Sequence, residues 1–302
     1  MLFRSPERGA HGTAAQWLRV PAFFAGGGPA WHSQEVTAEL PRHADVVIVG
    51  AGLAGLVAAR TLGLNGIDSV ILESSDGVGG RVRSDIVDGF VLDRGFQVLL
   101  TGYPEIHRHL DIDALNLRAF EPGALVWREG KGTVVGDPFR RPKTLVSTAT
   151  ASIGSVSDKA RIALLRAKLL RSDPKALLRG DDIPTAAALR GMGFSSTMID
   201  RFFRPLVGGI QLDPSLATSR RMFDVIFRTL ADGDSAVPER GMGTITEQLA
   251  SRLTRTSIHL DTPAVAVEPG RVVVSGGRSI TAKNVIVATE GPVAATLLRS
   301  EE

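Results

Sequence analysis

The chain has 302 residues, of which 43% are hydrophobic, and a formal net charge of +3 at pH 7. It is long enough to bury a large core, and so mild a positive charge gives no reason to expect a nucleic-acid partner. It contains no cysteine, which excludes disulfides and thiolate metal sites, and its six histidines show no ligand spacing beyond His107-x-His109, so we expect no metal site.

Residues 1–44 are rich in arginine and glycine and contain few acids. This composition fits an organelle transit segment, but it also fits sequence that is not native to the protein. In either case we expect a disordered tail. No apolar run reaches the roughly 20 residues needed to span a bilayer. We therefore expect a soluble protein of the cytoplasm or, if the tail is a transit segment, of an organelle stroma such as that of a plastid.

Residues 45–55 read Asp-Val-Val-Ile-Val-Gly-Ala-Gly-Leu-Ala-Gly, an apolar strand that runs into a G-x-G-x-x-G turn. The β-branched run at 46–49 is typical of a strand buried on both faces of a parallel sheet. In such a turn Gly50 permits the tight bend, Gly52 leaves room for a phosphate, and Gly55 lets the next helix pack closely. That helix, expected over residues 53–62 with Leu53 on its inward face and Ala54 in its first turn, would direct its N-terminus at the anion.

A second strand is expected over residues 69–72, after the helix-stop signal Asn65-Gly66. It ends in Glu73, about 20 residues past the glycine turn, where an acid would bind the ribose hydroxyls of an adenosine. Strand, glycines, helix, second strand and acid occur in register, which predicts a dinucleotide site.

Residues 76–84 read Asp-Gly-Val-Gly-Gly-Arg-Val-Arg-Ser. Gly79 and Gly80 would expose backbone amides and Arg81 would add a fork of donors, a second phosphate clamp that a nicotinamide enzyme does not need. The segment resembles the glycine-glycine-arginine signature of the flavin-containing amine oxidase superfamily, which includes phytoene desaturase-like and protoporphyrinogen oxidase-like enzymes. The resemblance implies FAD, bound non-covalently, with Gly80 and Arg81 on its pyrophosphate. It also implies an α/β fold: a Rossmann-like FAD-binding domain with a parallel sheet and an inserted α+β substrate domain.

The resemblance continues through residues 89–97, where an Asp-x-Gly step would pass near the flavin ring. It places Gly95 and Gln97 at the cofactor and makes Asp93 a further candidate. Many amine oxidases carry a basic residue two positions after the ribose acid, whereas this chain has Ser75 there. That departure implies fewer contacts to the adenosine.

The resemblance implies a substrate domain over residues 91–239, between FAD-binding segments at 45–90 and 240–302. Residues 124–127 and 132–135 predict a hairpin, and residues 157–178 a basic helix ended by Gly180. The basic face fits either solvent or a weak peripheral membrane contact. Further helices are expected from Pro184 to Gly191, from Ser195 or Ser196 to a break at Gly208-Gly209, and over residues 216–232.

Thr244-x-x-Glu247 predicts a capping box on a helix that returns to the cofactor domain. Four strands should follow at about 257–260, 264–267, 271–275 and 283–289. By resemblance, Ala264 would contact the adenine, and the last strand would rejoin the cofactor sheet. The sequence given stops at Glu302, before the last glycine-rich FAD segment of that family. We therefore expect a fragment that retains the ADP half of the site.

The implied reaction is a two-electron dehydrogenation with FAD as hydride acceptor, and no catalytic acid or base stands out. The substrate would be apolar, such as a polyene or tetrapyrrole, or else an amine. Tyr103 is the only tyrosine, which weakens the case for an aromatic cage around a cationic amine. The alternatives are a non-catalytic binding or escort protein of the same fold, an inactive fragment, and an NAD-dependent enzyme. The sequence leaves the oligomeric state open.

Overall fold

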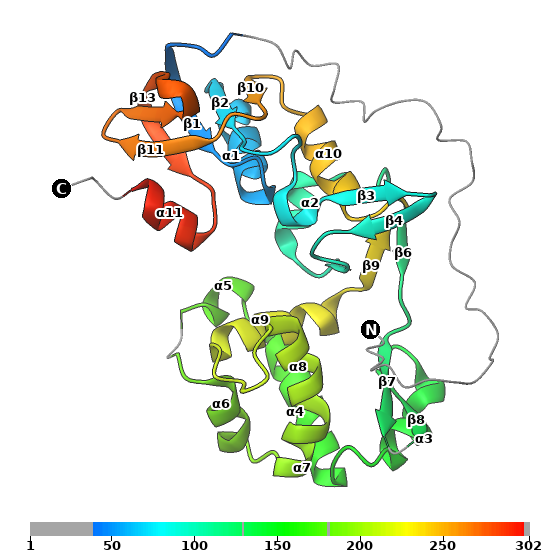
Figure 1. Ribbon diagram of the computed structural model, residues 1–302. Coiled ribbons are helices and arrows are strands. Elements are labelled where there is room, and N and C mark those ends of the chain that lie inside the picture. The colour runs from blue at the N-terminus through cyan, green and yellow to red at the C-terminus, as the bar shows by residue number, and fades with distance from the viewer. Residues whose placement is uncertain (1–38, 129, 180–181, 299–302) are drawn as a thin grey trace.

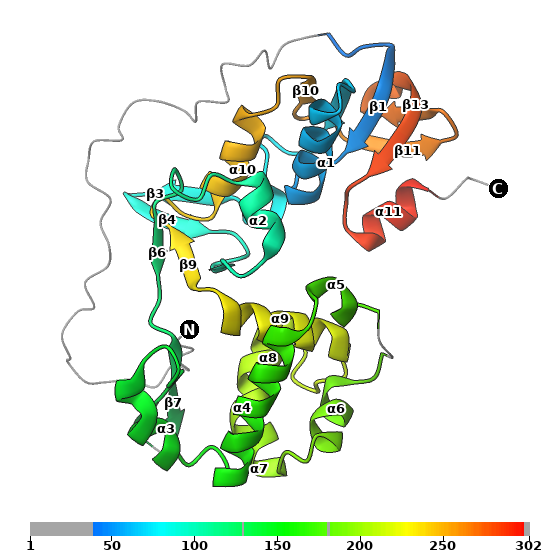
Figure 2. The same ribbon diagram turned by 180° about the vertical axis from the view of Figure 1, so that it is seen from behind.

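The computed structural model describes residues 39–128, 130–179 and 182–298. These residues form two lobes (Figures 1 and 2). The sheet lobe comprises residues 39–120 and 235–298, and the helical lobe comprises residues 121–234. The elements of the sheet lobe are β1 (His43–Val49), α1 (Leu53–Leu64), β2 (Ser69–Leu72), β3 (Ser84–Val87), β4 (Phe90–Asp93), β5 (Leu99–Leu100), α2 (Pro104–His109), β6 (Leu117–Ala119), β9 (Ser235–Pro238), α10 (Gly243–Ser251), β10 (Thr256–His259), β11 (Ala264–Glu268), β12 (Arg271–Val274), β13 (Ser279–Val287) and α11 (Gly291–Leu297). Those of the helical lobe are β7 (Gly123–Arg128), β8 (Lys131–Gly136), α3 (Leu145–Thr150), α4 (Val156–Arg171), α5 (Pro174–Leu177), α6 (Thr185–Gly191), α7 (Ser196–Met198), α8 (Arg204–Gln211) and α9 (Arg220–Asp232).

A six-stranded sheet in the order β10-β2-β1-β13-β12-β11 forms the centre of the sheet lobe. The pairs β10–β2, β2–β1 and β1–β13 are parallel, whereas β12 and β11 are antiparallel additions. Val49 lies opposite both Leu72 and Val287, so three parallel strands end at one edge. The β-branched run of β1 is buried on both faces, as predicted, and Val47 and Ile48 are completely buried. The order of the strands therefore brings the glycine turn to the carboxyl edge, in the middle of the parallel sheet.

Apolar side chains cover both faces of this sheet. Leu56 of α1 and Leu249 of α10 pack with Ile48 and Ile71 on one face. Leu297 of α11 packs with strand residues on the other face. The two helices beside the glycine turn are thus held against the sheet by buried aliphatic side chains.

A small sheet in the order β5-β9-β6 lies beside the central sheet and extends the sheet lobe. Leu115, just before β6, packs with Val82, Met242 and Ile245 in a separate buried cluster. Residues 91–120 and 235–239 thus lie against the predicted cofactor domain rather than with the helices. The predicted domain boundaries remain a prediction.

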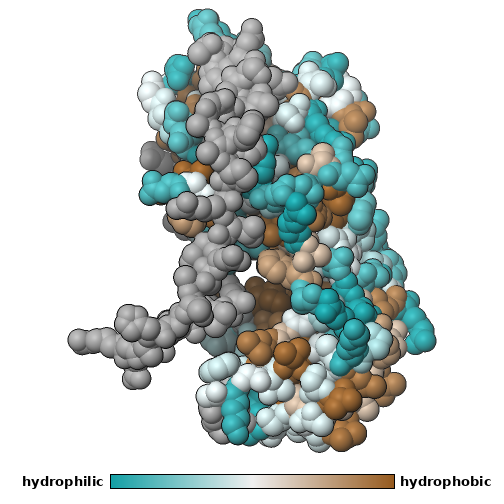
Figure 3. All heavy atoms as spheres, turned by 90° about the vertical axis from the view of Figure 1, so that its right-hand side faces the viewer, coloured by the Kyte–Doolittle hydropathy of each residue, from teal (hydrophilic) through white to brown (hydrophobic). Residues whose placement is uncertain are grey.

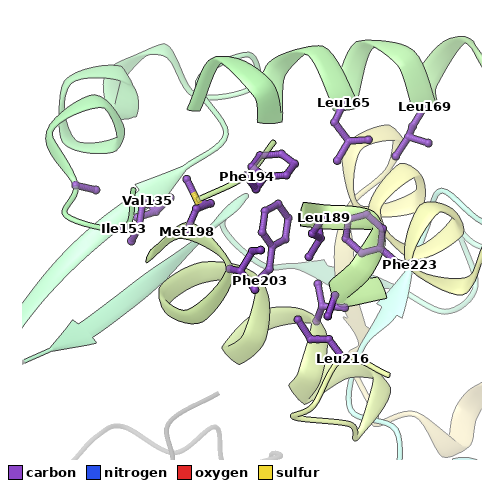
Figure 4. Packing of buried hydrophobic residues seen from close by; sticks show 14 residues of the cluster. Val135, Ile153, Leu165, Leu169, Leu189, Phe194, Met198, Phe203, Leu216 and Phe223 are labelled. Atoms are coloured by element: carbon purple, nitrogen blue, oxygen red, sulfur yellow. The ribbon is translucent and has the colours of Figure 1, made fainter. Parts of the chain in front are cut away.

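Aromatic packing forms the core of the helical lobe (Figure 4). Phe203 is completely buried, with its ring centroid 4.9 Å from that of Phe194 and 5.9 Å from that of Phe223 in edge-to-face geometry. The predicted hairpin forms as β7 and β8, and Val135 of β8 joins this core. This core fixes the hairpin relative to the helices of the same lobe. The hairpin and the helices therefore lie together on one side of the space between the lobes.

The helix predicted over residues 157–178 is two helices, because Pro174 begins a new one. The helix α4 ends at Arg171, and Asp173 caps α5 by accepting a hydrogen bond from the Lys175 amide at 3.1 Å. Proline has no amide hydrogen and forces the preceding residue out of the helical region, so one continuous helix was the wrong prediction. Gly180 lies outside the described residues.

The predicted break at Gly208-Gly209 was also wrong, because α8 continues to Gln211 and ends at Leu212 with φ +55°. Gly208 instead permits a close approach: a Cβ there would lie 3.1 Å from the carbonyl oxygen of Asp213. The next helix begins at Arg220 rather than residue 216, and the Ser219 hydroxyl caps it. The glycine at 208 thus serves packing, not termination.

The predicted capping box does not form at the start of α10. This helix begins at Gly243, with no capping hydrogen bond from a side chain at its cap residue Met242. Its first amides donate instead to the β3–β4 hairpin: Met242 N–H to Asp93 Oδ1 at 2.9 Å, and Gly243 N–H to Ser84 Oγ at 2.7 Å. A tertiary cap therefore replaces the local one and ties the hairpin to the helix.

Candidate functional site

The glycine turn connects β1 to α1 at the carboxyl edge of the central sheet. Gly50 has φ +105° and donates its N–H to the carbonyl of Leu72 at 2.8 Å, a conformation that favours glycine. A Cβ on Gly55 would lie 1.9 Å from the carbonyl oxygen of Gly50, which no rearrangement of a side chain relieves. Gly50 and Gly55 are therefore required by the fold itself, in the bend and the helix packing that the sequence predicted.

Gly52 differs, because nothing in the protein requires it. Its φ is −72°, and a Cβ there would have no atom within 4 Å. It lines the cavity described below, as does the exposed Ala54. The first amides of the 12-residue helix α1 have no carbonyl partner within the helix, so they are available to an anion at this point. The absence of a side chain at position 52 therefore leaves room for a ligand and is not required by the fold.

Glu73 follows β2 and holds the turn in place. Its side chain is 8% exposed, and Oε2 accepts the Ala51 amide at 2.7 Å. Oε1 accepts both the amide and the hydroxyl of Ser75, at 2.9 Å and 2.8 Å. Ser75, at the position where many amine oxidases carry a basic residue, thus holds the carboxylate in place. Glu73 also lines the cavity, where its oxygens have further lone pairs to accept hydroxyl donors.

Gly79 and Gly80 lie directly against the first glycine turn. Both have positive φ, +112° and +52°, and the Gly79 amide donates to the carbonyl of Ala51 at 2.8 Å. A Cβ on Gly80 would lie 3.7 Å from the Cα of Gly52. The two predicted phosphate-binding segments, some 30 residues apart in sequence, thus form one backbone surface.

Arg81 is exposed at this surface and lines the cavity. Within the described residues its side chain has no hydrogen-bond or ion-pair partner. Gly95 packs on its backbone, since a Cβ there would lie 2.4 Å from the carbonyl oxygen of Arg81. The exposed Gln97 and, from β11, Ala264 also line the cavity. Apart from the buried Gly55, the predicted cofactor residues therefore surround one space, although their contact with a cofactor remains a prediction.

Asp93 does not line this space. Its carboxylate accepts the Ser84 hydroxyl at 2.5 Å and the Met242 amide, so it anchors α10. Its carboxylate thus has a structural role, and its place beside the flavin ring remains a prediction. Leu53 was predicted to face inward, but it is 44% exposed and lines the cavity, because the helix N-terminus overhangs the sheet edge.

The cavity has a volume of about 3910 Å³ and is lined by residues of both lobes. A typical ligand pocket measures roughly 300–1,000 Å³, so there is room for a large cofactor and a substrate together. On the face of the molecule that Figure 3 shows, hydrophobic residues lie deep in a hollow between the lobes. The glycine surface and the helical lobe thus share one compartment.

Sequence reasoning missed the lining residues that follow β13, namely Ala288, Thr289 and Glu290. Ala288 lies against Gly50, where a Cβ on the glycine would come within 3.1 Å of its carbonyl oxygen. The return of this strand to the cofactor sheet was predicted, and the end of a parallel strand at the carboxyl edge is the signal that would have placed these residues in the site.

In residues 39–298, leaving aside 129 and 180–181, no helix is long and apolar enough to cross a membrane. The same residues contain no group of three or more His, Asp or Glu side chains arranged to hold a metal ion. The positive charges of α4 do not form one outer face, because Arg166 donates to the carbonyl of Ala231 at 3.1 Å. A peripheral membrane contact of this helix remains a prediction.

Comparison with known proteins shows which of them share this architecture. Residues 53–301 match the family described as flavin-containing amine oxidoreductase. Putrescine oxidase of Kocuria rosea is 27% identical over 274 residues, covering 81% of this chain and 56% of the relative. Protoporphyrinogen oxidase 2 of Arabidopsis thaliana is 26% identical over 179 residues, covering 59% and 35%. The chain thus spans about half or less of the length of these relatives.

Solved structures give the same result for the fold. An oxidoreductase from Methanosarcina mazei superposes with a TM-score of 0.62 at 20% identity, covering 85% of this chain and 62% of that one. Putrescine oxidase bound to putrescine superposes with a TM-score of 0.58 at 21% identity, covering 84% and 60%. The predicted fold class is confirmed.

Proposed function

Because the chain belongs to the family of flavin-containing amine oxidoreductases, we propose that it binds FAD non-covalently in the sheet lobe and oxidises, by two electrons, a small substrate held beside the helical lobe. The observation that supports this most is the open backbone at Gly52. A Cβ there meets nothing in the protein, yet Gly79, Gly80 and the N-terminus of α1 converge on the same point.

The residues present fit the ADP part of FAD. The helix N-terminus and the amides around Gly79-Gly80 suit a pyrophosphate, and Arg81 adds a cation with no competing partner in the described chain. Glu73 has acceptor capacity for ribose hydroxyls, and its bonds to Ala51 and Ser75 fix its position beforehand. When bound, FAD supplies a hydride acceptor. The protein would orient the substrate and exclude water; no residue of this chain is assigned as acid or base.

The substrate we propose is apolar. Phe202, Ile210, Met222 and Phe227 of the helical lobe line the cavity, as does Tyr103, whose pKa is raised by burial. The relatives named above include an oxidase of putrescine, a cation, but here the chain's own Arg166 guanidinium lies 4.8 Å from the centre of the Phe139 ring. Because Arg166 already occupies the face of the Phe139 ring, a cationic substrate would be repelled from that ring.

Replacing Arg81 tests the cofactor assignment. In Arg81→Met the affinity for FAD, measured by quenching of flavin fluorescence, should fall on the order of tenfold or more, because a charge-assisted hydrogen bond is lost. The control is Arg42→Met, which removes an exposed arginine outside the cavity lining. Equal FAD affinity in both variants would refute the role of Arg81.

A further inference from the structure

Two cations lie together in the part of the cavity that belongs to the helical lobe. Lys159, in the first turn of α4, donates from Nζ to the carbonyls of Ala149 at 2.5 Å and Ala151 at 2.8 Å. Arg201, between α7 and α8, donates from Nη1 to the carbonyl of Ser152 at 2.9 Å. The three acceptors lie within residues 149–152, so the two charges lie near each other. Both side chains line the cavity and are only partly exposed.

These two charges are not neutralised by a carboxylate. Both cations donate only to backbone carbonyls, and neither forms an ion pair within the described residues. The acid next to Arg201 is Asp200, which is paired with Arg204 at 3.1 Å. Asp158, next to Lys159, is completely buried and does not line the cavity. The pair therefore presents a net positive charge to the cavity.

The segments that carry the pair add mainly apolar side chains to the cavity lining. These are Leu145, Val156, Phe202 and Pro205, with Asp200 as the one acid among them. Next to apolar walls a charge is screened less than in open water, so an anion that reaches this point is bound more strongly. A cation, in contrast, is repelled.

We propose that Lys159 and Arg201 form an anion subsite that binds the carboxylate of an otherwise apolar substrate. This inference rests on the proposed function, in that the bound compound is the one to be oxidised. It makes the two cations residues that determine specificity: they select a carboxylated apolar molecule over a neutral one, and reject a diamine. The oxidation itself would take place elsewhere on the substrate, away from the carboxylate.

The test uses cis-parinaric acid, a fluorescent polyene carboxylate, and its methyl ester, which has the same chain without the charge. On the unaltered protein the acid should bind at least about tenfold more tightly than the ester, as a charge-assisted contact would give. Lys159→Met and Arg201→Met should each remove most of this preference and leave the affinity for the ester unchanged. Arg201→Lys should retain much of it, because the charge remains.

The matched control is Lys175→Met, the same substitution at an exposed lysine of α5 outside the cavity lining. Circular dichroism checks that each variant is folded; if Lys159→Met unfolds, the comparison of Arg201→Met with Arg201→Lys decides. Equal affinity for acid and ester, no binding of the acid, or a preference that survives Arg201→Met would overturn the subsite. FAD affinity is measured on the same samples: its retention leaves the proposed function standing when the subsite fails, and its absence refutes the proposed function itself.

Discussion

Alanine at Gly55 should destabilise the fold strongly, whereas alanine at Gly52 should weaken FAD binding with little effect on stability. The reason is that the two glycines serve different purposes. At Gly55 the new Cβ would lie 1.9 Å from the backbone oxygen of Gly50, so α1 or the turn must move. We expect a loss of at least about 3 kcal/mol in the free energy of unfolding. At Gly52, where φ is −72° and nothing lies within 4 Å of the Cβ, stability should change by less than about 1 kcal/mol.

The affinity for FAD should fall in Gly52→Ala even though the fold is retained. The methyl group of Gly52→Ala would occupy the space in which a phosphate approaches the backbone, so affinity should fall at least about tenfold, or 1.4 kcal/mol. Urea unfolding followed by circular dichroism gives the stability, and a fluorescence titration of the same folded samples gives the affinity. Two results would contradict these roles: Gly52→Ala binding FAD as tightly as the unaltered chain, or Gly55→Ala having the same free energy of unfolding as the unaltered chain.

Other substitutions test the fold around the site. Burial alone would raise the pKa of Asp158, but four hydrogen bonds from Ser155 and Ser195 hold it well below its usual range. This stabilisation is complete above about pH 4, the unfolded-state pKa, and is lost as the pH falls toward the lower folded-state pKa. In urea titrations Asp158→Asn should cost about 2–3 kcal/mol at pH 7 and flatten the loss of stability in acid, whereas an unchanged acid profile would contradict this. Phe203→Ala should cost about 3–5 kcal/mol in chemical denaturation, since the ring is completely buried, and a loss below 1 kcal/mol would show a softer core. Asp93→Ala should cost about 1 kcal/mol through the lost cap of α10 and raise amide hydrogen exchange in its first turn; unaltered exchange there would argue against the tertiary cap.

Short-range patterns explain what the sequence predicted well. The strand at 46–49, the positive-φ glycines and Glu73 depend on neighbours within about thirty residues and on the geometry of a parallel sheet. They placed the cofactor surface before any tertiary contact was known. The resemblance to flavin enzymes came from the same segments.

Long-range contacts explain what the sequence could not show. Asp93 looked like a flavin neighbour, but its partner Met242 lies 149 residues away, and that contact also displaced the predicted capping box. The sequence predicted that Lys159 lies on a basic outer face of its helix. In the structure its Nζ donates to the carbonyls of Ala149 and Ala151, which lie outside that helix and direct it toward the cavity. Pro174 could have been read correctly, since a proline after Asp173 is itself a helix-start signal.

We propose that the glycine surface of the sheet lobe holds the ADP part of FAD. Isothermal titration of this chain with FAD, alone and in saturating ADP, tests it most directly. We expect one FAD bound per chain, with the binding suppressed by ADP because both compete for the same backbone amides and for Glu73. Absence of FAD binding, or FAD binding unaffected by ADP, would contradict it.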